Sequence, residues 1–222
     1  MEWKAIDVVR ALAPLLGDER AAKLDAVARG RIVGVTIVLE DIRDPHNAAA
    51  ALRSSEAMGL AEVHLVTPRH RFRTSARVTQ GCEKWLAIAR HADAASCAEA
   101  LHRRGFRLLG ASPDAARTVG ELDARERTAL CFGNEHTGLS PELRALTDGE
   151  FKIPMYGCSQ SLNVSVAVAV AVHALTEARR SALGRIGDLD GEALDELRAK
   201  YYSLDVREWR KVVARYVERK GR

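Results

Sequence analysis

The chain has 222 residues, of which 47% are hydrophobic and 29% charged, and its formal net charge is +4. This length suits one domain with short appendages and can bury a substantial core. No apolar stretch approaches the ~18 residues that a membrane span requires, and residues 1–4 lack the apolar region of a signal peptide. We therefore expect a cytoplasmic protein that has no membrane partner.

The excess positive charge lies near the carboxyl terminus. Residues 179–222 contain 12 Lys/Arg and 8 Asp/Glu, so this segment alone carries a net charge of +4. Tyr201, Tyr202, Trp209 and Tyr216 are interleaved with these charges. Such a mixture suits contact with a polyanion through its phosphates and through aromatic faces. The alternative is that the aromatics form the apolar stripe of a docking helix. Both interpretations hold if the aromatics point inward and the arginines point outward.

The first predicted elements are helical. Residues 2–29 show helical periodicity in two pieces that break near residues 14–17, with Asp18 as the candidate N-cap. From Arg31 onward, short apolar runs alternate with amphipathic stretches, which predicts an α/β fold with a largely parallel sheet. The predicted strands are residues 32–39, 63–66, 85–89, 106–110, 129–132 and 151–153.

The sequence pattern of residues 160–180 is compatible with either a strand or a helix. Valine occupies every second position from Val164 to Val172, a pattern that by itself predicts a strand. The run is about three times a normal strand length, and it ends in two arginines, as helices often do. We predict a helix over residues 160–180, buried on most sides and capped by the polar residues 159–163. After a connector at 184–191, two further helices are expected at 192–202 and 205–220.

The four cysteines show no metal-binding spacing. Cys82, Cys97, Cys131 and Cys158 are 15, 34 and 27 residues apart, with no Cys-x-x-Cys pair and no histidine at zinc-finger spacing. We interpret them as reduced structural thiols and expect no structural metal. Cys158, beside the polar residues 159–163, is the cysteine that we expect near a functional site.

Three polar segments carry the candidate chemistry. The first is Asp44-Pro-His-Asn47, which leads to Arg53 and Glu56; the second is Gly133-Asn-Glu-His-Thr-Gly138; the third is residues 159–166. Each has an ordinary interpretation, as a helix entry with a surface ion pair, a loop, and a helix cap. The second has the glycine spacing of a phosphate loop, but Leu139 stands where the lysine should follow. No Gly-x-Gly turn occurs anywhere in the chain, so the usual dinucleotide-type site is not expected either.

Together with residues 58–67 and 81–85, these segments resemble the motifs of the SPOUT superfamily of RNA methyltransferases, in particular its SpoU/TrmH branch, over residues 30–182. The resemblance implies a homodimer with a deep carboxyl-terminal trefoil knot, a rare feature. It also implies that S-adenosyl-L-methionine lies among three loops, at 110–112, 133–138 and 153–162. The implied cofactor-binding residues, acting mostly through their backbone, are Ala111, Gly133, Asn134, Gly138, Ile153, Ser161 and Leu162.

The same resemblance implies catalytic roles for five residues. Arg53 would lie against the ribose and phosphate of the target nucleotide with Asn47 beside it, and Ser161 and Asn163 would contact donor and substrate. Because a guanidinium has a pKa above ~12, it is a poor base. We therefore expect Arg53 to hold the adjoining phosphate and to stabilise the developing alkoxide. Glu135 is expected to pair with Arg53 or another cation. His46 and His136, which match no catalytic position, are interpreted as facing solvent.

The expected domains are a helical extension at 1–30, a catalytic domain at 31–182 and a basic helical extension at 183–222. The short amino-terminal extension and the basic carboxyl-terminal helices resemble the tRNA enzymes of the branch. The expected activity is therefore 2′-O-methylation of the D-loop guanosine, position 18, of tRNA. Ribosomal RNA or another tRNA position remains an alternative substrate. A catalytically silent RNA-binding module of the same fold is the alternative from another class, and a generic nucleotide-binding protein is disfavoured by the missing lysine.

Overall fold

The computed structural model describes residues 3–67 and 81–221. The chain forms two compact units. The larger, which we call the sheet unit, comprises Ile32–Arg185, and the terminal unit joins the two ends of the chain, up to Arg31 and from Ile186 onward. Within the described ranges, no helix combines the length and the hydropathy needed to cross a bilayer.

The sheet unit is built on six parallel strands in the order β3-β2-β1-β5-β4-β6. All six predicted strands are present, although the third and the sixth are displaced by two residues. The α/β fold with a parallel sheet is thereby confirmed. The strands are β1 (Val35–Glu40), β2 (Glu62–Val66), β3 (Ala87–His91), β4 (Arg107–Ala111), β5 (Thr128–Phe132) and β6 (Gly149–Phe151).

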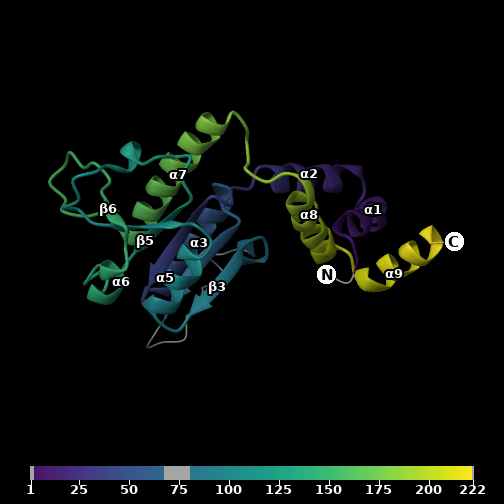
Figure 1. Ribbon diagram of the computed structural model, residues 1–222, viewed down its shortest axis with the longest axis horizontal. Coiled ribbons are helices and arrows are strands. Elements are labelled where there is room, and N and C mark those ends of the chain that lie inside the picture. The colour runs from purple at the N-terminus through teal and green to yellow at the C-terminus, as the bar shows by residue number, and fades with distance from the viewer. Residues whose placement is uncertain (1–2, 68–80, 222) are drawn as a thin grey trace. The chain divides into compact units, whose positions relative to one another are not determined.

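Helices cover both faces of this sheet (Figure 1). On one face, α3 (Pro45–Ala57) and α7 (Val164–Leu183) share a core with Ile37 and Leu39 of β1. On the other face, α5 (Ala94–His102) and α6 (Pro141–Ala145) share a core with Val38. Since successive strand residues point to opposite faces and both faces are covered, the central strands read as continuous apolar runs. The described part of the sheet unit also contains the 3-10 turns η1 (Cys82–Lys84) and η2 (Val119–Glu121).

The long Val/Ala run is helical, as predicted, but its start was predicted wrongly. Helix α7 begins at Val164, because Asn163 is its N-cap and accepts a hydrogen bond from the Ser165 amide at 2.9 Å. Residues 159–162 lie outside the helix. Val166 and Val170 are 46% and 40% exposed, so one face of α7 is open in the single chain.

The carboxyl-terminal end of α7 is fixed by Arg179. Its buried Nη1 donates to the carbonyl oxygens of residues 124, 125 and 126 at 2.8, 3.2 and 3.0 Å. A Cβ on Gly34 would lie 2.0 Å from Arg179 Nη2, so the glycine leaves room for the guanidinium. Because a buried charge is tolerated only when it is hydrogen-bonded, these carbonyls make the position possible.

The terminal unit contains four helices, and its amino-terminal half corrects one prediction. Helix α1 packs against α8 and α9, and α2 packs against α8. Asp18 is the first residue of α2 and not its cap; Gly17, with φ of 72°, ends α1 and occupies the N-cap position. Glycine adopts such a φ at little cost, so the break falls there and Pro14 stays inside α1. The helices are α1 (Ala5–Leu16), α2 (Asp18–Arg29), α8 (Gly191–Asp205) and α9 (Trp209–Lys220).

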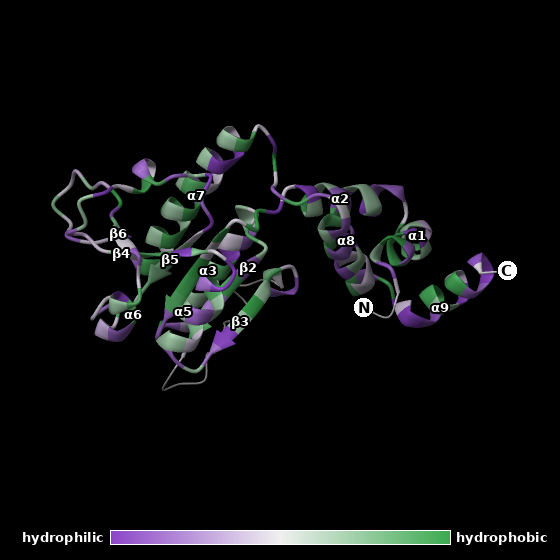
Figure 2. Ribbon diagram, in the orientation of Figure 1, coloured by the Kyte–Doolittle hydropathy of each residue, from purple (hydrophilic) through white to green (hydrophobic). Residues whose placement is uncertain are grey.

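Aromatic and basic side chains of the terminal unit point in different directions. Tyr202 and Val213 are buried, as the docking-helix interpretation predicts, and Trp209 packs edge-on against Trp3 with ring centroids 6.3 Å apart. Figure 2 shows hydrophilic and hydrophobic segments alternating along α9. The exposed cations of this region are Arg207, Arg210, Lys211, Arg215, Arg219 and Lys220.

Candidate active site

A cavity of about 910 Å³ lies at the carboxyl ends of β4, β5 and β6. Its walls come from residues 111–114 after β4, 132–138 at the end of β5, 151–156 at the end of β6, and 160–164 before α7. The carboxyl ends of parallel strands meet at one edge of a sheet, and ligands of open α/β sheets bind there. The volume lies in the range of pockets for small molecules and cofactors.

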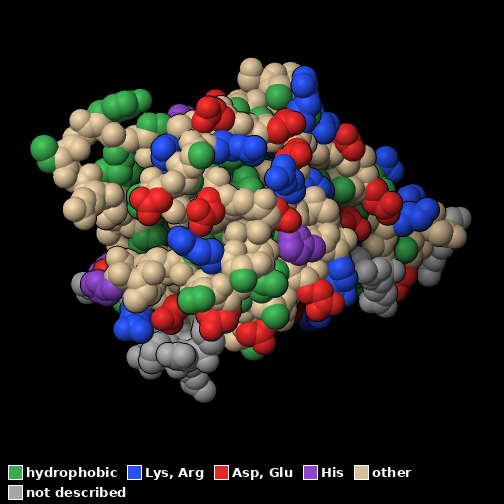
Figure 3. Space-filling model, turned by 60° about the vertical axis from the view of Figure 1, so that its left-hand side comes forward, with side chains coloured by type: hydrophobic (Ala, Val, Ile, Leu, Met, Phe, Trp, Pro, Cys, Tyr) green, Lys and Arg blue, Asp and Glu red, His purple; other side chains and the backbone are tan. Residues whose placement is uncertain are grey.

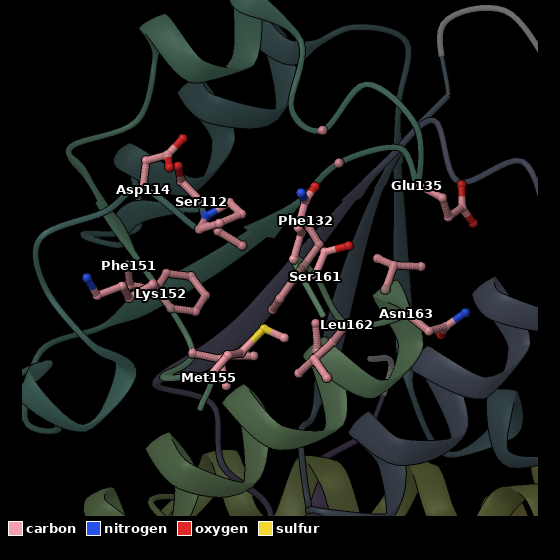
Figure 4. A pocket seen from close by; sticks show the side chains of 18 of the residues that line it. Ser112, Asp114, Phe132, Glu135, Phe151, Lys152, Met155, Ser161, Leu162 and Asn163 are labelled. Atoms are coloured by element: carbon pink, nitrogen blue, oxygen red, sulfur yellow. The ribbon is translucent and has the colours of Figure 1, made fainter. Parts of the chain in front are cut away.

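The pocket has polar groups on two sides and apolar side chains between them. In Figure 4, Asp114 and Lys152 lie on one side, Glu135 and Asn163 lie on the other, and Leu162 lies between them. Lys152, Asp114 and Met155 were not predicted as site residues. Their only signal in the sequence is position, since Asp114 and Met155 come shortly after predicted strands and Lys152 lies in the last predicted strand.

The second loop is closed on itself by backbone pairing. The N–H groups of Asn134 and Gly138 donate to each other's carbonyl oxygens at 2.9 Å. A Cβ on Gly133 would lie 2.1 Å from the carbonyl group of Gly138, and Gly138 itself has φ of 69°. Gly133 therefore makes room for the backbone of its own loop, and Gly138 supplies a conformation that other residues rarely adopt. The Asn134 side chain donates to the Asp41 carbonyl at 2.9 Å and so fixes the loop to the end of β1.

A chain of side-chain hydrogen bonds joins all three motifs. Asn163 Nδ2 donates to Asn47 Oδ1 at 3.0 Å, and Asn47 Nδ2 donates to Glu135 Oε1 at 2.9 Å. The direction of this chain follows from the cap of α7. The Ser165 amide can only donate, so the atom of Asn163 that faces it must be the oxygen. Asn163 therefore presents its NH₂ group to Asn47, Asn47 presents its own NH₂ group to Glu135, and Glu135 is left as the acceptor.

The structure brings most of the predicted site residues together. Among the predicted catalytic residues, Glu135, Ser161 and Asn163 line the cavity, and Asn47 is bonded to two of these three. Arg53 lies six residues further along α3, is exposed, and does not line the cavity. All the predicted cofactor-binding residues line it: Ala111, Gly133, Asn134, Gly138, Ile153, Ser161 and Leu162.

The described hydrogen-bond partner of Glu135 is Asn47, and its pairing with Arg53 or another cation stays a prediction. Its carboxylate accepts from the Asn47 amide, and the described ion pairs include none between Glu135 and Arg53 or another cation. The physical reason is position: Asn47 stands in the first turn of α3, nearer the loop than Arg53. Glu135 therefore orients a neutral amide.

Two histidines and four cysteines that the sequence analysis discussed differ in their exposure to solvent. His46 and His136 are both exposed, and His136 also lines the cavity. Cys158 is also exposed, and it is not among the residues that line the cavity. Cys82, Cys97 and Cys131 are buried, and burial raises the pKa of each of these thiols.

Comparison with known proteins gives one family. Residues 34–173 match the SpoU rRNA Methylase family, a segment that holds the six strands and the first half of α7. The tRNA (guanosine(18)-2′-O)-methyltransferase of Thermus thermophilus is 39% identical over 179 residues, which cover 80% of this chain and 90% of that protein. The protein of the same name from Borreliella burgdorferi is 31% identical over 211 residues, which cover 94% and 96% of the two chains.

The solved structures agree with this assignment. The structure of the TrmH/SpoU tRNA modifying enzyme of A. aeolicus matches with a TM-score of 0.74 and 27% identity, covering 86% of this chain and 98% of that one. The matched segment contains the pocket and the three motifs that the hydrogen-bond chain connects. The chain therefore belongs to the SpoU rRNA Methylase family.

Proposed function

We propose that this protein transfers the methyl group of S-adenosyl-L-methionine to the ribose 2′-oxygen of guanosine 18 in tRNA. The observation that carries the proposal is the hydrogen-bond chain from Asn163 through Asn47 to Glu135, at the edge of a cofactor-sized pocket. Two relatives that cover most of this chain are named for the same reaction, which supports the choice of substrate.

The pocket fits the methyl donor. Its volume of about 910 Å³ suits a molecule of that size, and its walls combine backbone from three loops with apolar side chains. When bound, S-adenosylmethionine supplies an electrophilic methyl group on a sulfonium. We assign the loops at Ala111, Gly133–Gly138 and Ile153–Leu162 to hold it, largely through backbone groups. Leu162 and Met155 supply apolar contact.

The nucleophile is the ribose 2′-oxygen, and we assign its positioning to residues at the start of α3 and α7. Asn47 is held between Asn163 and Glu135, so its amide is preoriented before RNA binds. Arg53, exposed on the same helix, grips the adjoining phosphate and stabilises the alkoxide that develops as the 2′-hydroxyl loses its proton. A phosphate oxygen or water accepts that proton. Holding the reactants in line contributes roughly 7 to 11 kcal/mol in favourable cases.

We propose that the terminal unit, which holds nearly all of the helical extensions predicted at 1–30 and 183–222, contacts the body of tRNA. The support is the set of exposed cations on and beside α9, with Tyr202 and Val213 facing inward. Phosphate contacts of this kind supply affinity that depends on salt concentration. On the surface shown in Figure 3, acidic and basic side chains are interspersed. The excess of positive charge in the carboxyl-terminal segment is therefore a better guide to RNA binding than the charge of a single face.

We further propose that the protein is a cytoplasmic homodimer with the trefoil knot of its family. Apolar side chains of α7 and the preceding loop are open in the single chain: Val166 is 46%, Val170 is 40% and Leu162 is 36% exposed. Contiguous exposed apolar surface of this kind marks an interaction site. A second copy packed on this face would bury it and place two pockets near one interface.

The test is tritiated methyl transfer from S-adenosylmethionine to an unmodified tRNA transcript. We expect incorporation that disappears when guanosine 18 is replaced by adenosine. Labelling of a ribosomal RNA fragment, with none of tRNA, would keep the chemistry and overturn the substrate. Donor binding without transfer to any RNA would overturn the assignment as an enzyme and favour a silent RNA-binding module.

A further inference from the structure

Three side chains with metal-binding atoms meet at the β3 edge of the sheet. His64 of β2, His91 of β3 and Cys97 of α5 place one ligand atom each within 4.8 Å of one another. The Nδ1 atom of His64 and Nε2 of His91 share a hydrogen bond of 3.0 Å, and the two stacked rings have centroids 5.2 Å apart. His64 is 2% exposed and Cys97 is fully buried, while His91 is half-buried. The cluster is therefore largely enclosed, with one member open to solvent.

The sheet register explains why these residues converge. Val66 pairs with His91 across β2 and β3, and His64 precedes Val66 by two residues. Side chains two residues apart share a face, so both imidazoles point to the face that α5 covers. Cys97 lies on the inward side of α5, in one core with Val66 and Ala98. The sequence alone does not reveal this cluster, because its three ligands are 27 and 6 residues apart and lie on three different elements.

The outer nitrogen of His64 is placed as it is in many metal sites. Its Nε2 is buried, has no hydrogen-bond partner, and lies 3.6 Å from Glu62 Oε1. Glu62 is itself held by Arg104 through contacts of 3.1 and 2.5 Å. A carboxylate behind a histidine fixes the tautomer that presents the other nitrogen to a metal.

The charges around the cluster favour a cation. Carboxylates face it from separate elements: Glu62 is beside His64, Asp93 acts on His91, and Glu40 acts on Cys97. Arg104 offsets the charge of Glu62. Cys97 would bind a cation as its thiolate, because a coordinating thiol is deprotonated.

We propose that His64, His91 and Cys97 form a binding site for a divalent cation of the zinc type. Two imidazoles and one thiolate are ligands that zinc prefers, with a fourth position left for water on the side of His91. Zinc–nitrogen bonds of about 2.0–2.1 Å in tetrahedral geometry place the two nitrogens roughly 3.3 Å apart, so a small movement from 3.0 Å suffices. On binding, the Cys97 proton leaves to solvent, His91 changes tautomer so that its proton moves from Nε2 to Nδ1 by exchange with solvent, and His64 keeps its proton on Nε2, facing Glu62.

The site would fasten the β3 edge strand to β2 and α5, away from the methyl-transfer pocket. None of its three ligands lines that pocket. In Figure 2 the end of β3 is hydrophilic, and this edge strand is less buried than its neighbour β2. An edge strand that ends in polar residues gains little from burial, and a metal bridge to its neighbour would compensate.

The test uses cobalt as a spectroscopic probe on the full chain, freed of metal by a chelator and kept reduced. We expect one cobalt per chain, visible bands of a four-coordinate site, a sulfur-to-cobalt charge-transfer band, and displacement of the cobalt by zinc. His91→Asn, at a half-buried strand end that tolerates a polar side chain, should weaken binding by about 100-fold or more. His102→Asn, an exposed histidine on α5, is its matched control and should leave binding unchanged.

Two further variants separate the thiolate from the support behind the histidine. Cys97→Ser should abolish the charge-transfer band, whereas Cys158→Ser, at the exposed cysteine, should retain it. Glu62→Gln, which keeps the shape of the side chain, should reduce affinity about 10–100-fold. Circular dichroism checks that each variant is folded; if Cys97→Ser unfolds, His91→Asn decides. The proposal is overturned if no cobalt binds, or if the bands survive His91→Asn and Cys97→Ser in folded protein.

Discussion

The two ends of α7 are held by different kinds of contact. At the amino-terminal end, exposed Asn163 caps the helix and passes a hydrogen bond to Asn47 and on to Glu135. At the carboxyl-terminal end, buried Arg179 donates to three consecutive carbonyl oxygens. Exposed polar contacts contribute little to folding because water competes for them, whereas unpaired buried groups are costly. One end of the helix can therefore be devoted to orienting groups for chemistry while the other end secures the fold.

The largest expected effect is on stability, at the buried end. Arg179→Met leaves the carbonyl oxygens of residues 124–126 without this donor, so the free energy of unfolding should fall by about 3 kcal/mol. The folded fraction should keep its rate of methyl transfer within about twofold, since Arg179 is remote from the pocket residues. Denaturant unfolding and single-turnover assays measure the two quantities. Arg103→Met, at the exposed C-cap of α5, is the control and should change stability by less than about 0.5 kcal/mol.

The next largest effect is expected on the rate of methyl transfer, at Arg53 of α3. Arg53→Lys keeps the charge but loses the planar fork, so turnover at saturating tRNA should fall about 100-fold with stability unchanged. Rapid-quench methyl transfer measures the rate, and Arg103→Lys is the matched control. Near-normal turnover of Arg53→Lys would remove Arg53 from the assigned role.

Substitutions in the hydrogen-bond chain should cause smaller losses of activity, and these losses should not be independent of one another. Asn47→Ala and Glu135→Gln should each lower kcat/KM by about tenfold. The double variant should lose less than the sum of the two free energies, because both changes break one unit. Asn163→Ala should lose a similar factor and also destabilise the protein by about 1 kcal/mol, since it removes a helix cap. Additive losses in the double variant would show that the two side chains act separately.

The open face of α7 predicts the smallest effect on the isolated chain. Val170→Glu places a charge on the proposed dimer surface and should raise the dimer dissociation constant at least about tenfold, with little change in unfolding of the monomer. Sedimentation at several concentrations measures this. Leu204→Glu, at an exposed apolar residue of the terminal unit, is the control. A protein that is monomeric before substitution would refute the dimer directly.

The sequence predicted the layers of the fold better than the starts of its helices. Strands β1 and β5 are buried throughout, so their apolar runs are unambiguous. The start of α7 was placed four residues early, because several side chains between residues 159 and 163 are capable of capping and only Asn163 does so. The α2 start was misplaced for a related reason: Asp18 is a good cap by type, but the positive φ of Gly17 decides the boundary.

The residues that line the pocket with their backbone were predicted, whereas the contacts between side chains of the site were predicted less well. Gly133 and Ile153 were predicted from the family resemblance, and both line the pocket, just beyond the ends of β5 and β6. The hydrogen-bond partner of Glu135 could not be predicted from the sequence, because the Asn47 amide, 88 residues away, competes with any cation for the carboxylate. The cluster of His64, His91 and Cys97 was missed because spacing rules detect ligands only on one local motif, and strand register brings these three together.

The most direct test of the proposed function is to identify the methylated nucleoside in tRNA after reaction. Nuclease digestion followed by mass spectrometry of the fragments locates the methyl group and separates ribose from base methylation. We predict one 2′-O-methylguanosine per tRNA, at position 18. A methyl group on a guanine base, or on the ribose of another nucleotide with guanosine 18 unmodified, would contradict the account.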